Sequence, residues 1–237
     1  MTANHPRFFY IHAVYPFALL VVLSAAIHFF DIDRLVADYF YGLQGHSWAW
    51  KGSWLAERVL HQGGRSLSLL IALVVFMAML LAYARASFRR HQKPLLYLFC
   101  AAGGSSLLVS ILKALLAVSC PWEFARYGGQ LPYHSVIEQL MLRNGAGCFP
   151  AAHASAGYAW VAVYFVGCIY ASRWRWVGLA MALLFGLALG VAQQIRGAHF
   201  ISHDLWTLAV CWFYCLGLCL YMFSKQPERS YAGLLCH

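Results

Sequence analysis

Six long apolar runs constrain this chain more than any other feature of its sequence. They lie at about residues 11–30, 66–86, 94–117, 154–171, 176–194 and 204–223. Each is close to the length of about 20 residues that an α-helix needs to cross a hydrocarbon core about 30 Å thick. Only 11% of the residues are charged, whereas soluble domains have about 25%. The pattern predicts an all-α, six-transmembrane-helix bundle that forms one integral membrane domain over residues 1–237.

The basic residues between these runs indicate how the bundle is oriented. In a six-span arrangement, nine of the 17 Lys and Arg residues fall on one side, where Glu228 is the only acid. The nine are Arg7, Arg85, Arg89, Arg90, Lys93, Arg173, Arg175, Lys225 and Arg229. The positive-inside rule places this side, and both termini with it, in the cytoplasm. We therefore expect a bacterial inner-membrane protein whose opposite side faces the periplasm.

The segment between the first two runs is predicted to lie on the outer membrane surface as one or two short helices. Its apolar residues repeat at helical spacing from Leu35 to Leu43, and Asp31 or Asp33 is placed to cap such a helix. Three tryptophans follow, and this residue type is common at the boundary between water and lipid. They are Trp48, Trp50 and Trp54.

Two of the eight cysteines share a long outer loop, from residue 119 to residue 150. If that side is oxidising, Cys120 and Cys148 are a candidate disulfide that closes the loop. A metal site shared by the two cysteines is the alternative. Five other cysteines lie within apolar runs and are expected to be small apolar residues there. These five are Cys100, Cys168, Cys211, Cys215 and Cys219, while Cys236 lies in the C-terminal tail.

Three polar clusters stand at the outer ends of the last four runs. The first contains Lys113, whose amine either extends to the membrane surface or binds an anion. In the second, "CFPAAH", Pro150 ends the loop and His153 begins a span. The amides near Ala152 are then expected to be free for a phosphate, which suits the positive end of a helix. A lone histidine at this position is more often a capping or interface residue than a catalyst.

The third cluster is "QQIRGAHFISHD", which places four ionisable groups within nine residues. They are Arg196, His199, His203 and Asp204. In a continuous helix, residues three or four positions apart share a face, whereas a break at Gly197 would arrange them along a turn. The spacing of His199 and His203 also suits a metal, although the Glu of a zinc protease motif is absent.

Together the clusters predict a cationic site that bears histidines. Cations and helix-start amides stabilise the charge on phosphate oxygens. One histidine can attack phosphorus, another can protonate the leaving oxygen, and a further group can orient the nucleophile. Such a phosphate site needs no cofactor and no metal. A nucleic-acid partner is not expected, because no basic stripe is interleaved with exposed aromatic residues.

In this order, the three clusters resemble the type-2 phosphatidic acid phosphatase superfamily of membrane lipid phosphatases. The family pattern is K-x6-R-P, then P-S-G-H, then S-R-x5-H-x3-D, and its counterparts here lie between Lys113 and Asp204. The stretches "CPWEFARYGG", "CFPAAH" and "IRGAHF" are similar to a divergent branch with C-P-W, P-x-G-H and R-G-A-H-F patterns.

The first two motifs depart from the family pattern. Cys120 occupies the position of the first motif's arginine, and Arg126 is a candidate to supply the missing charge. Ala151 and Ala152 replace the serine and glycine of the second motif. Ala152 keeps the amide that a phosphate needs, whereas the serine hydroxyl is lost.

The third motif departs at both polar positions beside His199. Gln193 stands where the family has arginine, and Arg196 lies one helical turn later. His203 stands where the family has aspartate, and Asp204 follows it. Either can orient His199, with a slight preference for Asp204 because a carboxylate better stabilises an imidazolium.

The resemblance implies a lipid phosphatase that hydrolyses a phosphate monoester or diphosphate through a phosphohistidine at His199, without a metal. His153 is the implied acid, with His203 or Asp204 as the orienting residue. The implied phosphate ligands are Lys113, Arg196, Arg126 and the amide of Ala152. The partners are then a phosphorylated lipid and the surrounding membrane lipids. The alternatives are an inactive phospholipid-binding or transport relative, a lipid phosphotransferase, and a metalloenzyme that uses the same histidines.

Overall fold

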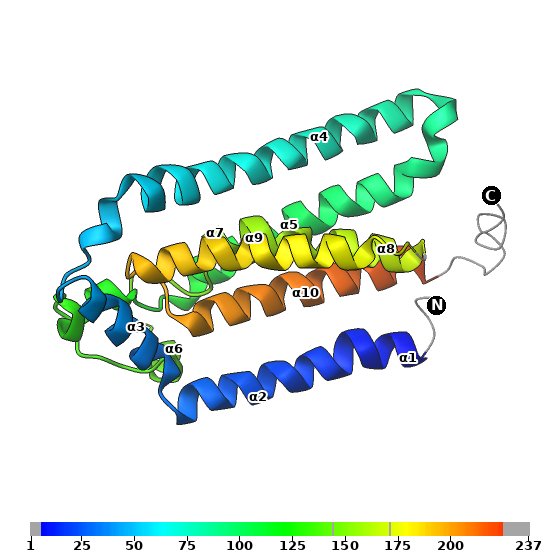
Figure 1. The fold of residues 1–237 in the computed structure, drawn as a ribbon. Helices are drawn as coiled ribbons and strands as arrows, with labels where there is room; N and C mark the ends of the chain where they lie inside the picture. The colour runs from blue at the N-terminus through cyan, green and yellow to red at the C-terminus, as the bar shows by residue number, and fades with distance from the viewer. Residues whose placement is uncertain (1–5, 144, 171, 225–237) are drawn as a thin grey trace.

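The computed structural model describes residues 6–143, 145–170 and 172–224. In these residues the regular secondary structure is entirely helical and no strand occurs. The long helices run side by side, and the short helices α3 and α6 gather with the loops at one end of the bundle (Figure 1). The predicted all-α architecture is therefore confirmed.

In the part of the chain that the structure describes, six helical segments are long and apolar enough to cross a membrane, which confirms the six predicted runs. The first comprises α1 (Pro6–Phe9), the π-helical turn η1 (Tyr10–Val14) and α2 (Tyr15–Phe29). The second comprises η3 (Leu55–Gly63) and α4 (Gly64–Ala84), and the third η4 (Ala86–His91) and α5 (Gln92–Leu116). The fourth comprises α7 (Ala152–Tyr158), η7 (Ala159–Val161) and α8 (Ala162–Ile169). The last two are α9 (Arg175–Ile195) and α10 (Ile201–Phe223).

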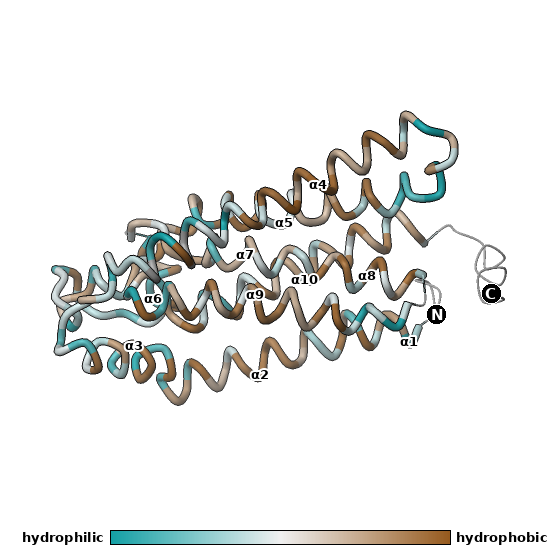
Figure 2. Tube along the Cα trace, turned by 45° about the horizontal axis from the view of Figure 1, so that its top comes forward, coloured by the Kyte–Doolittle hydropathy of each residue, from teal (hydrophilic) through white to brown (hydrophobic). Residues whose placement is uncertain are grey.

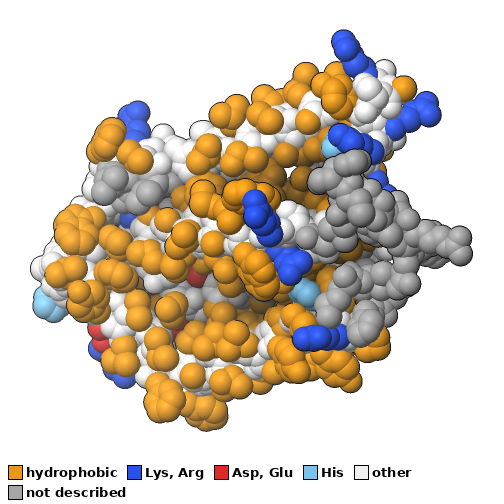
Figure 3. Space-filling view, turned by 45° about the vertical axis from the view of Figure 1, so that its right-hand side comes forward, with side chains coloured by type: hydrophobic (Ala, Val, Ile, Leu, Met, Phe, Trp, Pro, Cys, Tyr) orange, Lys and Arg blue, Asp and Glu red, His pale blue; other side chains and the backbone are white. Residues whose placement is uncertain are grey.

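The fourth span is the centre of the bundle. In its most apolar stretch 61% of the residues are buried, against 11% in each of the first two spans. Apolar side chains cover the outer faces of the long helices, where a lipid environment would meet them (Figure 3). Hydrophilic residues concentrate at the two ends, in the connection between α4 and α5 at one end and in the loops near α3 and α6 at the other (Figure 2). This distribution is the one expected of an integral membrane protein.

The predicted surface helix between the first two spans is α3 (Ile32–Leu43). Its predicted cap is wrong, because neither aspartate caps its start. Asp31 precedes the helix without a capping hydrogen bond and pairs with Arg34 instead. The carboxylate of Asp33 accepts hydrogen bonds from the backbone N–H and the hydroxyl of Ser202, at the start of α10. The surface helix is thereby joined to the last span.

The three tryptophans that follow α3 do not share one environment. The side chains of Trp50 and Trp54 are exposed, as expected of residues at the water–lipid boundary. Trp48 is half-buried, with its ring centroid 5.2 Å from that of Tyr41 and 5.9 Å from that of Tyr127. Trp48 therefore packs against two aromatic side chains of the protein, unlike the exposed Trp50 and Trp54.

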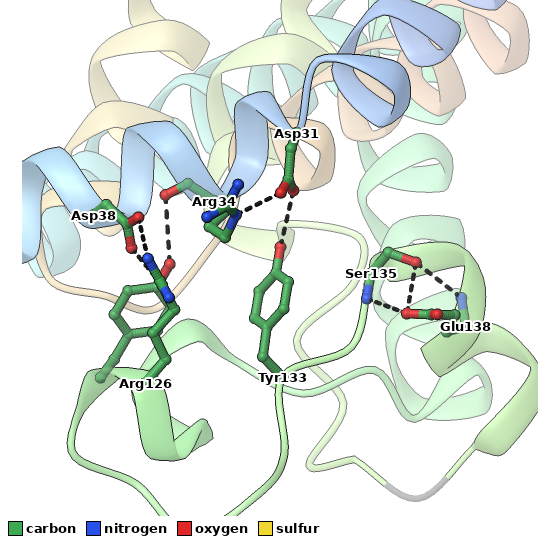
Figure 4. A network of polar contacts seen from close by, with 8 residues as sticks. Asp31, Arg34, Asp38, Arg126, Tyr133, Ser135 and Glu138 are labelled. Atoms are coloured by element: carbon green, nitrogen blue, oxygen red, sulfur yellow. Dashed lines mark hydrogen bonds and ion pairs between the residues drawn. The ribbon is translucent and has the colours of Figure 1, made fainter.

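The outer loop contains a helix that periodicity did not reveal, α6 (Val136–Leu142). Ser135 caps its start by accepting a hydrogen bond from the amide of Glu138, and the Glu138 carboxylate accepts one from the amide of Ser135 (Figure 4). Seven residues are too few for an apolar stripe to stand out, so the S-x-x-E capping box was the available signal. Two short 3₁₀ turns precede it, η5 (Pro121–Glu123) and η6 (Ala125–Tyr127).

Candidate active site

Three distant segments converge at the loop end of the bundle. Lys113 lies in the last turn of α5, His153 is the second residue of α7, and His199 lies in the break between α9 and α10. His199 is buried, and its Nδ1 lies 3.3 Å from Nδ1 of His203 in the first turn of α10. Lys113 and His153 lie near enough to place positive charge at His199.

The environment of His199 disfavours a positive charge on its imidazole. His199 lies between the two spans, and burial is the main reason why its pKa falls well below the ordinary value. Nearby positive charges lower the pKa further; their sources are His203, Lys113 and His153. A histidine that attacks phosphorus must carry a free lone pair, and the neutral form provides it.

The break that exposes His199 to this environment is formed at Gly197. Its backbone has a φ of 72°, in the left-handed region that glycine adopts without a steric penalty. A Cβ at this position would lie 2.4 Å from the ring of Trp48, so a side chain could not be accommodated. The carbonyl of Gly197 also accepts a hydrogen bond of 3.1 Å from the amide of Trp122. The loop that carries His199 is therefore held from two sides.

His203, rather than Asp204, is the neighbour of His199. The carboxylate of Asp204 turns toward α9, where it accepts a hydrogen bond from the side-chain amide of Gln194. The ring of His203 also contacts Phe149 edge-on, with ring centroids 5.2 Å apart. This geometry runs against the slight preference for Asp204 that the sequence suggested.

The guanidinium of Arg196 is held by protein groups. Its Nε donates to the carbonyl of Lys51 at 2.8 Å, Nη1 donates to the amide oxygen of Gln193 at 3.2 Å, and Nη2 pairs with the Glu57 carboxylate. Gln193, the residue at the family's arginine position, thus supports the arginine one turn later. Arg196 joins the end of α9 to η3 and to the preceding 3₁₀ helix η2 (Ala49–Gly52).

Arg126 forms a bidentate ion pair with Asp38 on α3 (Figure 4). Its Nε lies 2.8 Å from one carboxylate oxygen and its Nη2 lies 2.6 Å from the other. The hydrogen bonds from Arg126 are the largest cause that lowers the pKa of Asp38 below its ordinary value. Both side chains are partly exposed to solvent. This placement favours a role for Arg126 in fixing the loop to α3 over the predicted phosphate contact.

The second motif is fixed by α10. The amide of Ala151 donates to the Thr207 hydroxyl at 2.8 Å, so this amide is not free for a phosphate as the sequence suggested. The hydroxyl of Thr207 in turn lies 2.7 Å from the carbonyl of His203. Helix α7 begins at the next residue, Ala152, whose amide remains the predicted phosphate ligand.

Cys120 and Cys148 form a disulfide, as predicted, across 28 positions of the chain. Two backbone hydrogen bonds accompany it, from Cys148 to the carbonyl of Val118 at 2.6 Å and from Gly145 to that of Ala117 at 2.7 Å. These contacts tie the end of α5, which carries Lys113, to the segment that leads into α7. The cysteine at the position of the missing arginine therefore has a structural partner.

The family assignment follows from comparison with known proteins. The model of the PAP2 superfamily matches residues 94–227, more than half of the 237 residues. The chain belongs to the PAP2 superfamily. Its members are generally metal-independent phosphatases. No curated protein and no solved structure matches the chain at a significant level.

The matched region contains the PAP2 motif residues and most of the site. Lys113, His153 and His199 all lie within residues 94–227, whereas α3, η3 and α4 precede the match. Within the part of the chain that the structure describes, no group of three or more His, Cys, Asp or Glu side chains is arranged to hold a metal ion.

Several residues that support the PAP2 motifs were not singled out from the sequence. Gln194 holds Asp204, Glu57 pairs with Arg196, and Thr207 holds the turn before His153. Glu57 lies 139 positions from its partner, so no local pattern reveals the pair. Thr207 is four residues after His203, and this spacing on an apolar helix was the one local signal for a polar contact.

Proposed function

We propose that this PAP2 protein is a lipid phosphatase that removes a phosphate from a monoester or diphosphate through a phosphohistidine at His199. The observation that carries the proposal is the 3.3 Å contact between Nδ1 of His199 and Nδ1 of His203, both buried, with the half-buried Lys113 and His153 near enough to place positive charge at His199. If the Nδ1 proton of His199 is donated to His203, the Nε2 lone pair of His199 is available for attack.

The reaction uses the convergent residues in two steps. In the first, Nε2 of His199 forms a bond to phosphorus, the bond from phosphorus to the leaving oxygen breaks, and His153 gives that oxygen a proton. In the second, water attacks phosphorus, the N–P bond breaks, and His153 takes the proton of the water. Phosphate is released and both histidines return to their starting forms.

Lys113 and the amide of Ala152 hold the phosphate oxygens in this proposal. A cation fixed beside a helix start stabilises the charge that develops on those oxygens. Arg196 supports the site without binding the phosphate itself, because Gln193, Glu57 and the carbonyl of Lys51 already hold its three nitrogen atoms. We leave Arg126 outside the site because of its pairing with Asp38.

The chain acts as one domain in the inner membrane of a bacterium, with both termini in the cytoplasm and the site facing the periplasm. The excess of Lys and Arg on the side of the α4–α5 connection supports this orientation. Basic side chains are visible at that end of the molecule in Figure 3. The disulfide near the site fits an oxidising compartment.

Release of phosphate from a panel of lipid phosphates tests the proposal. The panel contains phosphatidic acid, phosphatidylglycerol phosphate, a polyprenyl diphosphate and lipid A, each presented to purified protein in detergent. We expect the wild-type protein to release phosphate from at least one lipid and the His199→Ala variant to release none above background. Full activity of His199→Ala on every lipid that the wild type cleaves would contradict the assignment.

The missing arginine of the first motif supports a second candidate, an inactive relative that binds phospholipid headgroups. Cys120 is in a disulfide and Arg126 is paired, so neither restores that charge. Brief incubation with a lipid bearing 32P in the terminal phosphate separates the candidates. Labelled protein that depends on His199 supports the enzyme, whereas lipid binding without label or phosphate release supports the inactive relative. Transfer of the label to a second lipid identifies a phosphotransferase.

A further inference from the structure

A cavity of about 330 Å³ opens between α4, α5 and α7, and His153 forms part of its wall. Besides His153, the polar side chains around it are one arginine and four serines. They are Arg65, Ser68, Ser106, Ser110 and Ser155. None of the described residues that line this cavity is a carboxylate. Three of the hydroxyls donate to backbone carbonyls: Ser106 to Ser155, Ser110 to Ser106 and Ser155 to Ala152. The guanidinium of Arg65 and the hydroxyl proton of Ser68 are therefore the donors that an anion in this cavity can meet.

Two contacts fix the part of α4 that carries Arg65. Gly64 packs so closely on α9 that a Cβ would lie 2.3 Å from Cδ2 of Leu189. One turn later, the hydroxyl of Ser68 accepts a hydrogen bond of 3.0 Å from the indole N–H of Trp160. Arg65 stands between these two contacts and also lines a neighbouring hollow with Gln62 and Ser66. Its backbone is held beside the cavity, while its exposed side chain can turn toward a ligand.

Arg65 also differs from the arginines that the motifs indicated. Arg126 is paired with Asp38, and the three nitrogens of Arg196 are held by protein groups. Among the described residues, the side chain of Arg65 makes no ion pair and no hydrogen bond. Lys113 then supplies charge near His199, and Arg65 is the arginine that shares a cavity with His153.

We propose that Arg65 binds an anionic group on the leaving part of the substrate, the part whose oxygen is protonated by His153. This rests on the proposed function, in which His153 gives a proton to the leaving oxygen. The enzyme then prefers lipids that carry a second phosphate beside the one removed. Lipid diphosphates and phospholipids with a terminal phosphomonoester on a phosphodiester headgroup share this chemistry.

The charge balance of the first step explains the preference. When the bond between phosphorus and the leaving oxygen breaks, that oxygen keeps the electron pair and takes a proton from His153. A second phosphate on the leaving part retains its negative charge throughout, and the guanidinium of Arg65 compensates that charge in the cavity. Phosphatidic acid leaves as neutral diacylglycerol, so Arg65 has no group to bind.

Comparison of substrates tests the role of Arg65. We expect Arg65→Ala to lower kcat/KM for a polyprenyl diphosphate and for phosphatidylglycerol phosphate by about 10- to 100-fold, because a hydrogen-bonded charge pair is lost. Activity on phosphatidic acid should change little. Arg65→Lys keeps the charge without the planar fork and should retain part of the preference. Arg58→Ala removes an exposed arginine that does not line the cavity and should leave the ratio of activities unchanged.

Two results would overturn the assignment of Arg65. One is an equal loss on all three lipids, which indicates a structural role; the other is an unchanged substrate ratio. A wild-type protein that releases no phosphate contradicts the proposed function instead. In that case, binding of the unreacted polyprenyl diphosphate to His199→Ala is compared with binding to the His199→Ala, Arg65→Ala double variant. Weaker binding to the double variant supports the role of Arg65, and equal binding contradicts it.

Discussion

His203 stands where the PAP2 pattern has an aspartate, and it changes the electrostatics of the neighbouring nucleophile. A carboxylate at this position would favour the cationic form of His199, whereas a neutral imidazole accepts the Nδ1 proton without that effect. Burial already holds the pKa of His199 well below its ordinary value of 6.5. His199 is therefore expected to stay neutral, and ready to attack, under mildly acidic conditions.

Replacing His203 by aspartate should move the acid limb of the kcat/KM profile to higher pH. A carboxylate close to His199 raises the pKa of His199, so the imidazole becomes protonated and inactive at a higher pH than in the wild type. The expected displacement is about one pH unit or more. Profiles of both proteins on one lipid phosphate measure it, since the ionisation of the substrate is common to both.

Alanine at position 203 and asparagine at position 204 separate the two candidate partners of His199. We expect His203→Ala to lower kcat by about 100-fold or more, as expected when a catalytic histidine loses its orienting partner. Asp204→Asn should cost less than about tenfold, because the side chain of Asp204 faces Gln194. A larger loss in Asp204→Asn than in His203→Ala would return the orienting role to the aspartate.

The residues of the site were predictable from spacing, but their partners were not. Lys113, His153 and His199 stand at motif positions that can be read directly from the chain. The choice between His203 and Asp204 depends on where α10 begins after the break at Gly197, and adjacent residues on a helix point about 100° apart. The partner of Arg126 lies 88 positions away. Contacts of that kind exist only after the fold has formed.

Among the helices, α3 has a function that its amphipathic pattern did not reveal. The N-cap residue of α10 is Phe200, whose side chain makes no capping hydrogen bond. Asp33 supplies the cap from α3 instead, through hydrogen bonds of 2.9 Å and 2.6 Å with the amide and hydroxyl of Ser202. A negative charge at a helix start is also favoured by the helix dipole. The surface helix thereby holds the turn that contains His203.

The link between α3 and α10 predicts a specific dependence of stability on pH. Burial raises the pKa of Asp33 above its ordinary value of 3.8. Its contribution to stability is therefore fully present below that value and is lost as the pH rises through the folded-state pKa. Asp33→Asn has no such titration, so its unfolding temperature relative to the wild type should rise with pH over this interval. Thermal unfolding in detergent at a series of pH values measures the difference.

Asp38→Asn on the same helix is the matched control. Its ion pair with Arg126 lowers the pKa of Asp38, so the contribution of Asp38 is present above the ordinary value of 3.8 and is lost as the pH falls through the folded-state pKa. The unfolding temperature of Asp38→Asn relative to the wild type should therefore fall as the pH rises. Slopes of the same sign for both variants would contradict the environment assigned to Asp33.

In the whole molecule, the disulfide connects the helix that carries Lys113 to the segment before His153. Replacing both Cys120 and Cys148 by alanine should lower the free energy of unfolding by about 2–4 kcal/mol, because the unfolded chain gains freedom. Activity should fall as well, since the two sides of the phosphate site lose their covalent link. Cys100→Ala, at a half-buried free cysteine, is the control. Unchanged stability and activity in the double variant would show that the backbone contacts suffice.

The six spans were the most predictable feature of the molecule, because length and hydropathy are local properties. Their starts were less predictable. Within the described residues, the first span is helical from Pro6 and the second from Leu55, both earlier than the apolar runs. In the second case the helix continues through polar residues such as Arg58 and Gln62, since a helix satisfies its backbone hydrogen bonds internally. This early start is what places Arg65 beside the cavity.

The orientation of the bundle in the membrane can be tested directly. The charge pattern and the disulfide both predict that the end with the site faces an oxidising compartment. Met141 on α6 is exposed at the end with the site, and Phe88 is exposed in the connection between α4 and α5 at the opposite end. In intact cells, a membrane-impermeant maleimide should label Met141→Cys, while Phe88→Cys should react only after the membrane is permeabilised. Wild-type protein gives the background from the native cysteines. The reverse pattern would place the site in the reducing cytoplasm, where the link between Cys120 and Cys148 would not persist. Phosphate release by the purified protein is independent of that outcome, so the labelling separates the compartment from the chemistry.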